Sequence, residues 1–189
     1  KDGVPACAYA NLTGEALCQV DPRLAFYDTE HVPIDTCNDH HKSMPEPFDD
    51  EEVRQMPWAH FASGGAGGGM RWPNRKPHIL TAGMHRAQRA LANFLPLIDW
   101  QHFERSNLNL ELGDEDRRLR LFGCGDSREV IIWILRADCI GPKGMLDRHR
   151  DLLRVPLRIP GLRPGNYNVT ACDTHTGAAT SIFNVPSSS

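Results

Sequence analysis

The sequence predicts a fold in two parts, an α/β segment followed by a small antiparallel β-sandwich, and three observations support this class. Residues 24–100 have the order strand, helix, strand, helix, which is the α/β pattern. After residue 106, apolar and polar residues alternate in short stretches separated by turns, as in a sandwich. The strand at residues 24–31 becomes acidic only at its carboxyl end, which is typical of a parallel α/β barrel. We therefore expect TIM-barrel-like βα units in residues 1–104, a β-sandwich domain in 105–186 and a disordered tail in 187–189.

Composition narrows the classes of partner. Of the 189 residues, 40% are hydrophobic and 24% are charged, as in an ordinary globular protein. The net charge of -3 argues against a generic nucleic-acid binder. The longest apolar run, Val130–Leu135, is too short to span a bilayer, so we expect no membrane as partner. No signal peptide begins at Lys1: either one was removed, or the numbering starts inside a larger protein.

The six cysteines form no CxxC pair, which argues against a structural zinc site of the usual spacing. They are Cys7, Cys18, Cys37, Cys124, Cys139 and Cys172. Disulfides in a secreted protein and free buried thiols are both compatible with this distribution.

The strand at residues 24–31 carries the first candidate site residues. Alternate side chains of a strand share a face, so Asp28 and Glu30 lie on one face and His31 on the other. Burial of either carboxylate without a partner would be costly, and a partner or a functional role is therefore expected. The alternative is that both carboxylates are solvated at the strand end or cap a loop.

A helix and a glycine run follow. Acidic residues at Asp49–Glu52 favour a helix start, and we expect this helix to end near Ser63, with Pro57 kinking it or ending its first segment. The glycine-rich residues 64–69 lack the ending of a P-loop. They are either a flexible linker or a segment that approaches a neighbour closely. The return to a short strand at Met70–Trp72 favours close approach and makes Trp72 a candidate stacking platform.

Thr81 is positioned to cap an amphipathic helix that ends at Pro96–Trp100. Beyond it, short strands are expected at Leu108–Leu112, Leu119–Leu121, Val130–Leu135, Val155–Ile159, Tyr167–Ala171 and Ile182–Val185. The turns between them fall at Gly113, Gly125, Gly161–Asn166 and Thr176–Gly177. Trp133 lies inside an apolar run and is expected in the core.

Six stretches resemble a known architecture. Asp28–His31, Trp58–Pro73 and Phe94–Trp100 resemble the end of a bacterial (β/α)8-barrel glycoside hydrolase of the cellulase-like or apiosidase-like type. Leu121–Asp126, Ile131–Leu135 and Gly161–Tyr167 resemble the β-sandwich that follows such barrels, often named a putative collagen-binding domain. The resemblance covers roughly residues 20 to 186.

The resemblance implies a retaining glycoside hydrolase, or the C-terminal part of one, acting on a β-glycan or β-glycoside. Glu30 matches the nucleophile at the end of strand seven, with Asp28 and His31 orienting it or binding sugar hydroxyls. Arg71 and Trp72 match the substrate-binding end of strand eight. The acid of such a barrel lies upstream of this chain, so autonomous activity is in question; Asp28 is the alternative acid. The parent protein is expected to be secreted or periplasmic, a cytoplasmic location staying open.

Two other functions remain open. The sandwich could be a non-catalytic module that binds carbohydrate or matrix protein, with the α/β part a remnant. A metal site from Asp28, Glu30, His31, Asp39, His40 and His41 fits no known spacing, so we expect neither metal nor cofactor. A truncated barrel exposes apolar strand edges, and we therefore expect the isolated chain to form a homo-oligomer or to depend on residues it lacks.

Overall fold

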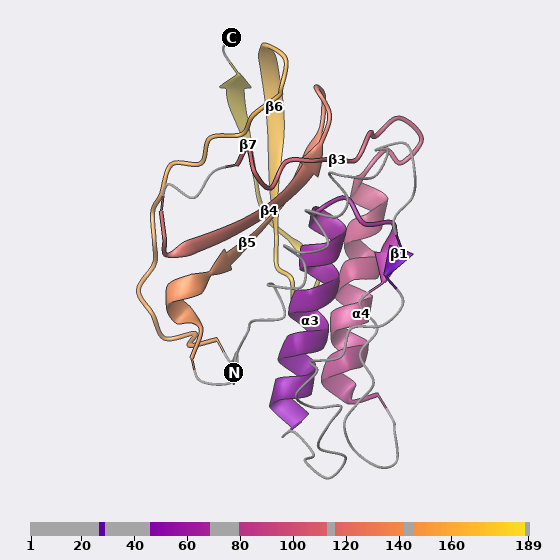
Figure 1. The fold of residues 1–189 in the computed structure, drawn as a ribbon, viewed down its shortest axis with the longest axis vertical. Coiled ribbons are helices and arrows are strands. Elements are labelled where there is room, and N and C mark those ends of the chain that lie inside the picture. Colours follow the sequence, from indigo (N-terminus) through magenta and orange to yellow (C-terminus); the bar gives the residue numbers. More distant parts are fainter. Residues whose placement is uncertain (1–26, 29–45, 69–79, 113–115, 142–145, 188–189) are drawn as a thin grey trace.

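The computed structural model of the chain describes residues 27–28, 46–68, 80–112, 116–141 and 146–187 (Figure 1). Its helices and strands have mixed α/β content, which confirms the coarse class expected from the sequence. One parallel pair of very short strands precedes two small antiparallel sheets. A barrel needs many more parallel strands than the described residues contain, and the barrel itself stays a prediction.

The parallel pair is built from two strands and one long helix. β1 (Tyr27–Asp28) leads to α3 (Glu46–Ala62), which leads to β2 (Gly67–Gly68). β1 and β2 run parallel, with Tyr27 beside Gly67 and Asp28 beside Gly68. Parallel strands require a crossover connection, which α3 provides. The expected order of strand, helix and strand is thus confirmed. The second strand lies at the glycines rather than at Met70–Trp72, which falls outside the described residues.

Helix α3 begins three residues before the acidic stretch Asp49–Glu52 and continues through Pro57, so the expected break at the proline was wrong. It ends where the backbone of Gly64 takes a φ of 95°, a left-handed conformation that glycine adopts without cost. The amide N–H of Gly64 donates to the carbonyl oxygen of Phe61 at 3.1 Å, which satisfies one of the last carbonyl groups of the helix.

Helix α4 (Ala82–Phe94) starts at the residue that the sequence indicated. The hydroxyl of Thr81 accepts a hydrogen bond from the amide of Met84 at 3.0 Å and donates to the carboxylate of Asp50 on α3. One side chain thereby caps α4 and joins the two helices. A short 3₁₀ helix, η1 (Leu95–Leu97), closes α4, and the indole N–H of Trp100 donates to the carbonyl oxygen of Leu95 at 2.7 Å.

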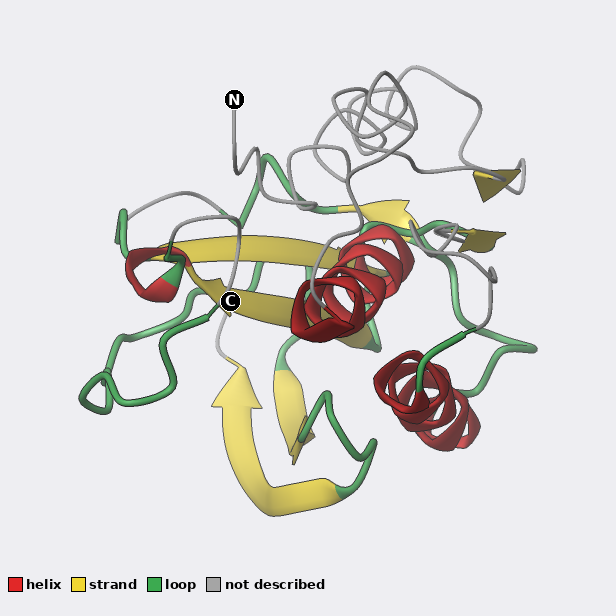
Figure 2. Cartoon of the chain, turned by 90° about the horizontal axis from the view of Figure 1, so that it is seen from below, coloured by secondary structure: helices red, strands yellow, loops and turns green. Residues whose placement is uncertain are grey.

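The first antiparallel sheet has the order β3 (Ser106–Asn107), β4 (Leu119–Gly125) and β5 (Val130–Arg136). The second is the hairpin of β6 (Gly165–Cys172) and β7 (Ala179–Ser187). Figure 2 shows this hairpin as a layer separate from the β4–β5 pair. Four of the six expected strands are therefore confirmed, and β7 extends through Ser187, which the sequence had assigned to the tail.

Two expected strands were wrong. Leu108 and Leu112 lie in a turn, in which the amide of Leu112 donates to the carbonyl oxygen of Leu108 at 2.9 Å. Both leucines are buried, although they stand four residues apart, a spacing that an α-turn also brings onto one side. Residues 155–159 alternate in hydrophobicity but belong to none of the described strands.

One hydrophobic core joins the helices to the first sheet. Its buried members are Trp58, Ala59, Phe61, Ala62, Phe103, Phe122, Cys124, Ile131, Trp133 and Leu135. They come from α3, from the segment before β3, and from β4 and β5. The rings of Phe122 and Trp133 lie 5.2 Å apart, and Trp133 is 4% exposed, so its expected core position is confirmed. The core crosses the position at residues 104 and 105 where the sequence suggested a domain boundary.

The turn between β6 and β7 packs directly on α4. Asn93 donates from its side-chain amide to the carbonyl oxygen of Thr176 at 3.0 Å. Gly177 has a φ of 71°, and a methyl group added there would lie 2.1 Å from the carbonyl oxygen of Ala90. Gly161 has a similar φ of 80°, but no atom lies within 4 Å of the corresponding position.

This contrast predicts unequal effects of the same substitution. Gly161→Ala should lower the free energy of unfolding by about 1–2 kcal/mol, the cost of a left-handed backbone for an L-residue. Gly177→Ala should cost roughly 1–3 kcal/mol more, because the methyl group must displace α4 or the turn. Urea denaturation of both variants measures the difference. Equal losses would show that the turn does not pack on α4 as described.

Candidate functional site

The five site residues that the sequence singled out are reached only in part. Asp28 lies in β1, where its backbone is described and pairs with Gly68 of β2. Glu30, His31, Arg71 and Trp72 lie outside the described residues. The structure therefore brings none of their side chains together, and their roles remain predictions.

Within the described residues, a cavity of about 640 Å³ lies between β5, β6 and the segment that joins α4 to β3. This volume is within the range of roughly 300–1,000 Å³ found for small-ligand sites. The lining residues are Phe94, Leu97, Ile98, Asp99, His102, Asp126, Arg128, Glu129, Val130, Ile131, Ile132, Ile159, Leu162, Asn166, Tyr167, Asn168, Val169 and Thr170. The set combines an apolar wall with a charged group of residues near the β4–β5 turn.

The wall contributed by β6 contains an aromatic ring in a fixed position. The hydroxyl of Tyr167 lies 2.9 Å from the carbonyl oxygen of Arg163 and 3.3 Å from that of Ser127. Donation to these acceptors ties β6 to the β4–β5 turn and restrains the ring. Because Tyr167 stands opposite Val185 in the antiparallel hairpin, both side chains share the face of the hairpin that carries the ring.

Three carboxylic acids, Asp99, Asp126 and Glu129, line the other part of the cavity. The carboxylate of Asp99 lies 2.8 Å from Nδ1 of His102, and this hydrogen bond lowers the pKa of Asp99. Asp126 accepts hydrogen bonds from the amides of Arg128 at 2.6 Å and Glu129 at 3.0 Å. Although burial acts to raise the pKa of Asp126, these amides and that of Glu104 lower it overall.

Glu129 differs from the other two acids. Burial raises the pKa of its carboxyl group, and the negative charges of Asp126 and Asp99 raise it further. Glu129 forms no ion pair with any side chain that the structure describes. Neighbouring carboxyl groups whose pKa values are shifted in opposite directions are typical of functional sites. The cavity is therefore the best-supported ligand site among the described residues.

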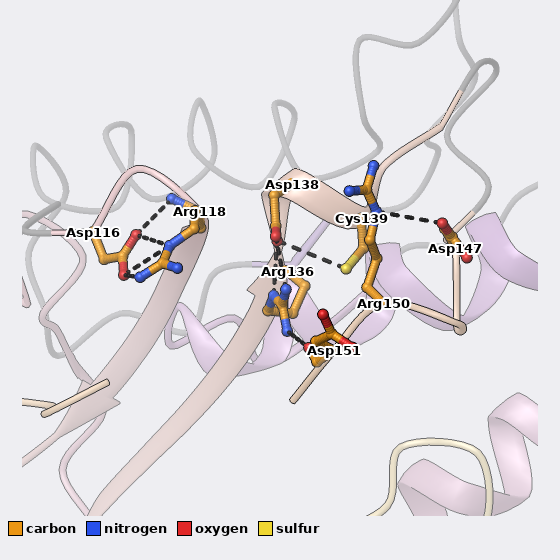
Figure 3. Close-up of polar contacts among 8 residues, drawn as sticks. All are labelled: Asp116, Arg118, Arg136, Asp138, Cys139, Asp147, Arg150 and Asp151. Carbon is orange, nitrogen blue, oxygen red and sulfur yellow. Dashed lines mark hydrogen bonds and ion pairs between the residues drawn. The ribbon is translucent and has the colours of Figure 1, made fainter. Parts of the chain in front are cut away.

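A second polar cluster, at the other end of β4 and β5, is structural (Figure 3). Arg136 binds Asp138 through Nε and Nη2, each at 2.7 Å from a carboxylate oxygen. Arg118 binds Asp116 in the same two-pronged manner. Arg136 also donates to the carbonyl oxygen of Asp151 at 3.2 Å, which ties β5 to the following loop. Burial raises the pKa of the neighbouring Cys139 thiol, so this cysteine is not activated as a nucleophile.

A third cluster joins the start of α3 to the β6–β7 turn. Glu51 and Arg54 are buried and form an ion pair, and Gln55 donates to Glu51 at 2.8 Å. Arg54 also donates to the hydroxyl of Thr174 at 2.7 Å. Because the charges are paired and hydrogen-bonded to each other, this cluster fastens the hairpin to the helix rather than offering a free reactive group.

Comparison with known proteins adds no constraint: no family model, no curated protein and no solved structure matches the chain. None of the described helices is long and apolar enough to cross a membrane. Across the part of the chain that the structure describes, no group of three or more histidine, cysteine, aspartate or glutamate side chains could hold a metal ion.

The sequence analysis missed the cavity residues. Asp126 belonged to an expected turn and Tyr167 to an expected strand, but neither pattern indicates that the two approach the end of α4. The only local signal was the excess of polar side chains on β6, where Asn166, Asn168 and Thr170 alternate with Tyr167 and Val169.

The ion pairs of Figure 3 predict an acid-dependent contribution to stability. The hydrogen bonds from Arg118 and Arg136 lower the pKa of Asp116 and Asp138 from 3.8 to about 2. Since the folded-state pKa is the lower one, the contribution is present above pH 3.8 and is lost as the pH falls toward 2. In urea denaturation between these values, Arg136→Gln should lose less stability with falling pH than the unmodified chain.

The control is Arg154→Gln, which removes an exposed guanidinium whose side chain forms no ion pair with the described residues. This variant should keep the pH dependence of the unmodified chain. If both variants showed the same pH dependence, the Arg136–Asp138 pair would not contribute in the way described.

Proposed function

We propose that the chain is the C-terminal part of a retaining glycoside hydrolase that acts on a β-glycan or β-glycoside. Glu30 is the nucleophile in this proposal, Asp28 and His31 orient it or hold sugar hydroxyls, and Arg71 and Trp72 bind the substrate. The observation that carries the proposal is the parallel pairing of β1 and β2 through α3, which is the repeating unit of barrels with this chemistry.

The pairing supports the grouping of these residues through chain order. Parallel strands have their carboxyl ends at the same edge, and Asp28 is paired with Gly68 at that edge. Glu30 follows Asp28 by two residues, and Arg71 follows Gly68 by three. The two segments that carry the predicted residues therefore leave the same edge of the pair, where the sites of parallel α/β folds are built.

The chemistry needs two carboxyl groups about 5–5.5 Å apart, one ionised to attack the anomeric carbon and one protonated to assist the leaving group. The resemblance assigns the acid to a strand that precedes this chain. The nucleophilic half of the reaction is consequently the half that residues of this chain would perform. A substrate with a strongly activated leaving group needs no acid and isolates that half.

A non-catalytic carbohydrate-binding module is the second candidate, favoured by the cavity between β5 and β6. A restrained aromatic ring beside amide, hydroxyl and carboxylate groups suits a sugar, whose faces are apolar and whose edge carries hydroxyl groups. The buried position of Trp133 speaks against the other form of this candidate, an exposed row of aromatic residues on the sheet.

The hydrolase proposal is tested with 2-deoxy-2-fluoro glycosyl fluorides of the β-configuration. The carboxylate of Glu30 should displace fluoride and form a stable glycosyl ester, which mass spectrometry of the digested protein locates on the peptide that contains Glu30. Glu30→Gln should abolish the label, and any turnover of aryl β-glycosides should fall by at least roughly 10³-fold.

Glu111→Gln is the matched control, since it makes the same chemical change at an exposed position. It should be labelled like the unmodified chain. A folded chain labelled on another carboxylate would refute the role of Glu30. Absence of label with every sugar in a panel would refute the hydrolase proposal.

A further inference from the structure

We propose that the cavity between β5 and β6 binds a cationic sugar, namely an oligosaccharide of amino sugars whose amines are protonated. This inference rests on the carbohydrate-binding candidate of the proposed function and names the charge class of its ligand. It is carried by the cavity, by the balance of charges that line it, and by one carboxyl group that has no cationic partner among the described side chains.

The cavity is lined by three carboxylic acids and one guanidinium group, that of Arg128. Arg128 lies 3.4 Å from Asp126, and its other interaction is with the carbonyl oxygen of His102. Asp99 is paired with the imidazole of His102. The cations that line the cavity are thus used by two of the acids, and Glu129 is the third.

Glu129 is half-buried at the end of the β4–β5 turn. Its ionised form is disfavoured by burial and by the charges of Asp126 and Asp99, which raises the pKa of its carboxyl group. A cation delivered by a ligand would offset both effects. An ammonium group is compact and has several N–H donors, so it could bind Glu129 and a second acid at once.

The remaining lining suits a sugar rather than a simple amine. The ring of Tyr167 is restrained through its hydroxyl group, and a fixed aromatic face stacks on the apolar face of a pyranose with little loss of entropy. Asn166, Asn168 and Thr170 bring amide and hydroxyl groups that can exchange hydrogen bonds with sugar hydroxyls. A neutral glycan could use the ring and the amides but would leave Glu129 uncompensated, and an acidic glycan would be repelled.

The experiment is isothermal titration calorimetry of the full chain at about pH 6, where an amine is protonated. Three hexasaccharides of equal length serve as ligands: glucosamine, N-acetylglucosamine and glucose, all β-1,4-linked. The glucosamine hexamer should bind at least tenfold more tightly than either neutral hexamer. Its binding should weaken with added salt, because an ion pair is screened. Titrations are repeated with Glu30→Gln, so that hydrolysis cannot consume the ligand.

Glu129→Gln should weaken binding of the glucosamine hexamer at least tenfold and should leave the neutral hexamers unaffected. The control is Asp151→Asn, which removes one negative charge from an exposed residue outside the cavity. Asp151→Asn should bind like the unmodified chain.

Each other outcome overturns the inference. Equal weakening by Glu129→Gln and Asp151→Asn would show attraction to net charge without a site. Neutral hexamers that bind as tightly as glucosamine would show that the cavity does not select for charge, while the carbohydrate-binding candidate would stand. Failure of all three ligands to bind would remove the cavity as a sugar site. Labelling of Glu30 by fluoro sugars is measured separately, so the hydrolase proposal succeeds or fails independently.

Discussion

The packing of α3 on one face of the β4–β5 pair is the interaction on which the rest of the structure depends. Trp58 and Phe61 of the helix meet Phe122 and Trp133 of the strands in one buried cluster. Removal of each such side chain from water contributes about 1.5–3 kcal/mol. No other described contact between the first half of the chain and the sheet involves as many buried apolar side chains.

This packing also determines where a ligand site can form. Alternate residues of β5 point to opposite faces, so Ile131, Trp133 and Leu135 are buried while Ile134 stays 44% exposed. The second face of β5 is approached by the β6–β7 hairpin, whose Phe183 is 50% exposed. Because the hairpin covers this face incompletely, space remains between β5 and β6. The cavity is therefore a consequence of one sheet with a well-covered face and a partly covered face.

Local patterns predicted the elements whose cause is local. The cap at Thr81 depends on residues within one helical turn, and the apolar run at Val130 fits a strand that is buried on one face. The failures arose where long-range packing decides. Leu108 and Leu112 fit a strand by alternation, but both are buried by an α-turn, with Leu112 over Gly123. Residues 155–159 alternate equally well, yet no described strand pairs with them.

The candidate site shows the same limit. Glu30 and Trp72 were found because carboxylates after a strand and an aromatic after a glycine run are signals in the sequence itself. Glu129 gave no such signal, since its environment is made by Asp99, which precedes it by 30 positions, and by β6, which follows it. Proximity across elements is set by the sheet register and by the packing of the hairpin, and neither can be read from a single sequence.

The central claim, that α3 completes the core of the β4–β5 sheet, is tested most directly by expressing residues 105–189 without the preceding segment. Without α3, the face that carries Phe122 and Trp133 would be open to water. The account predicts that this fragment shows no cooperative urea unfolding by tryptophan fluorescence, whereas the full chain does. Cooperative unfolding of the fragment at the same urea concentration as the full chain would contradict the account.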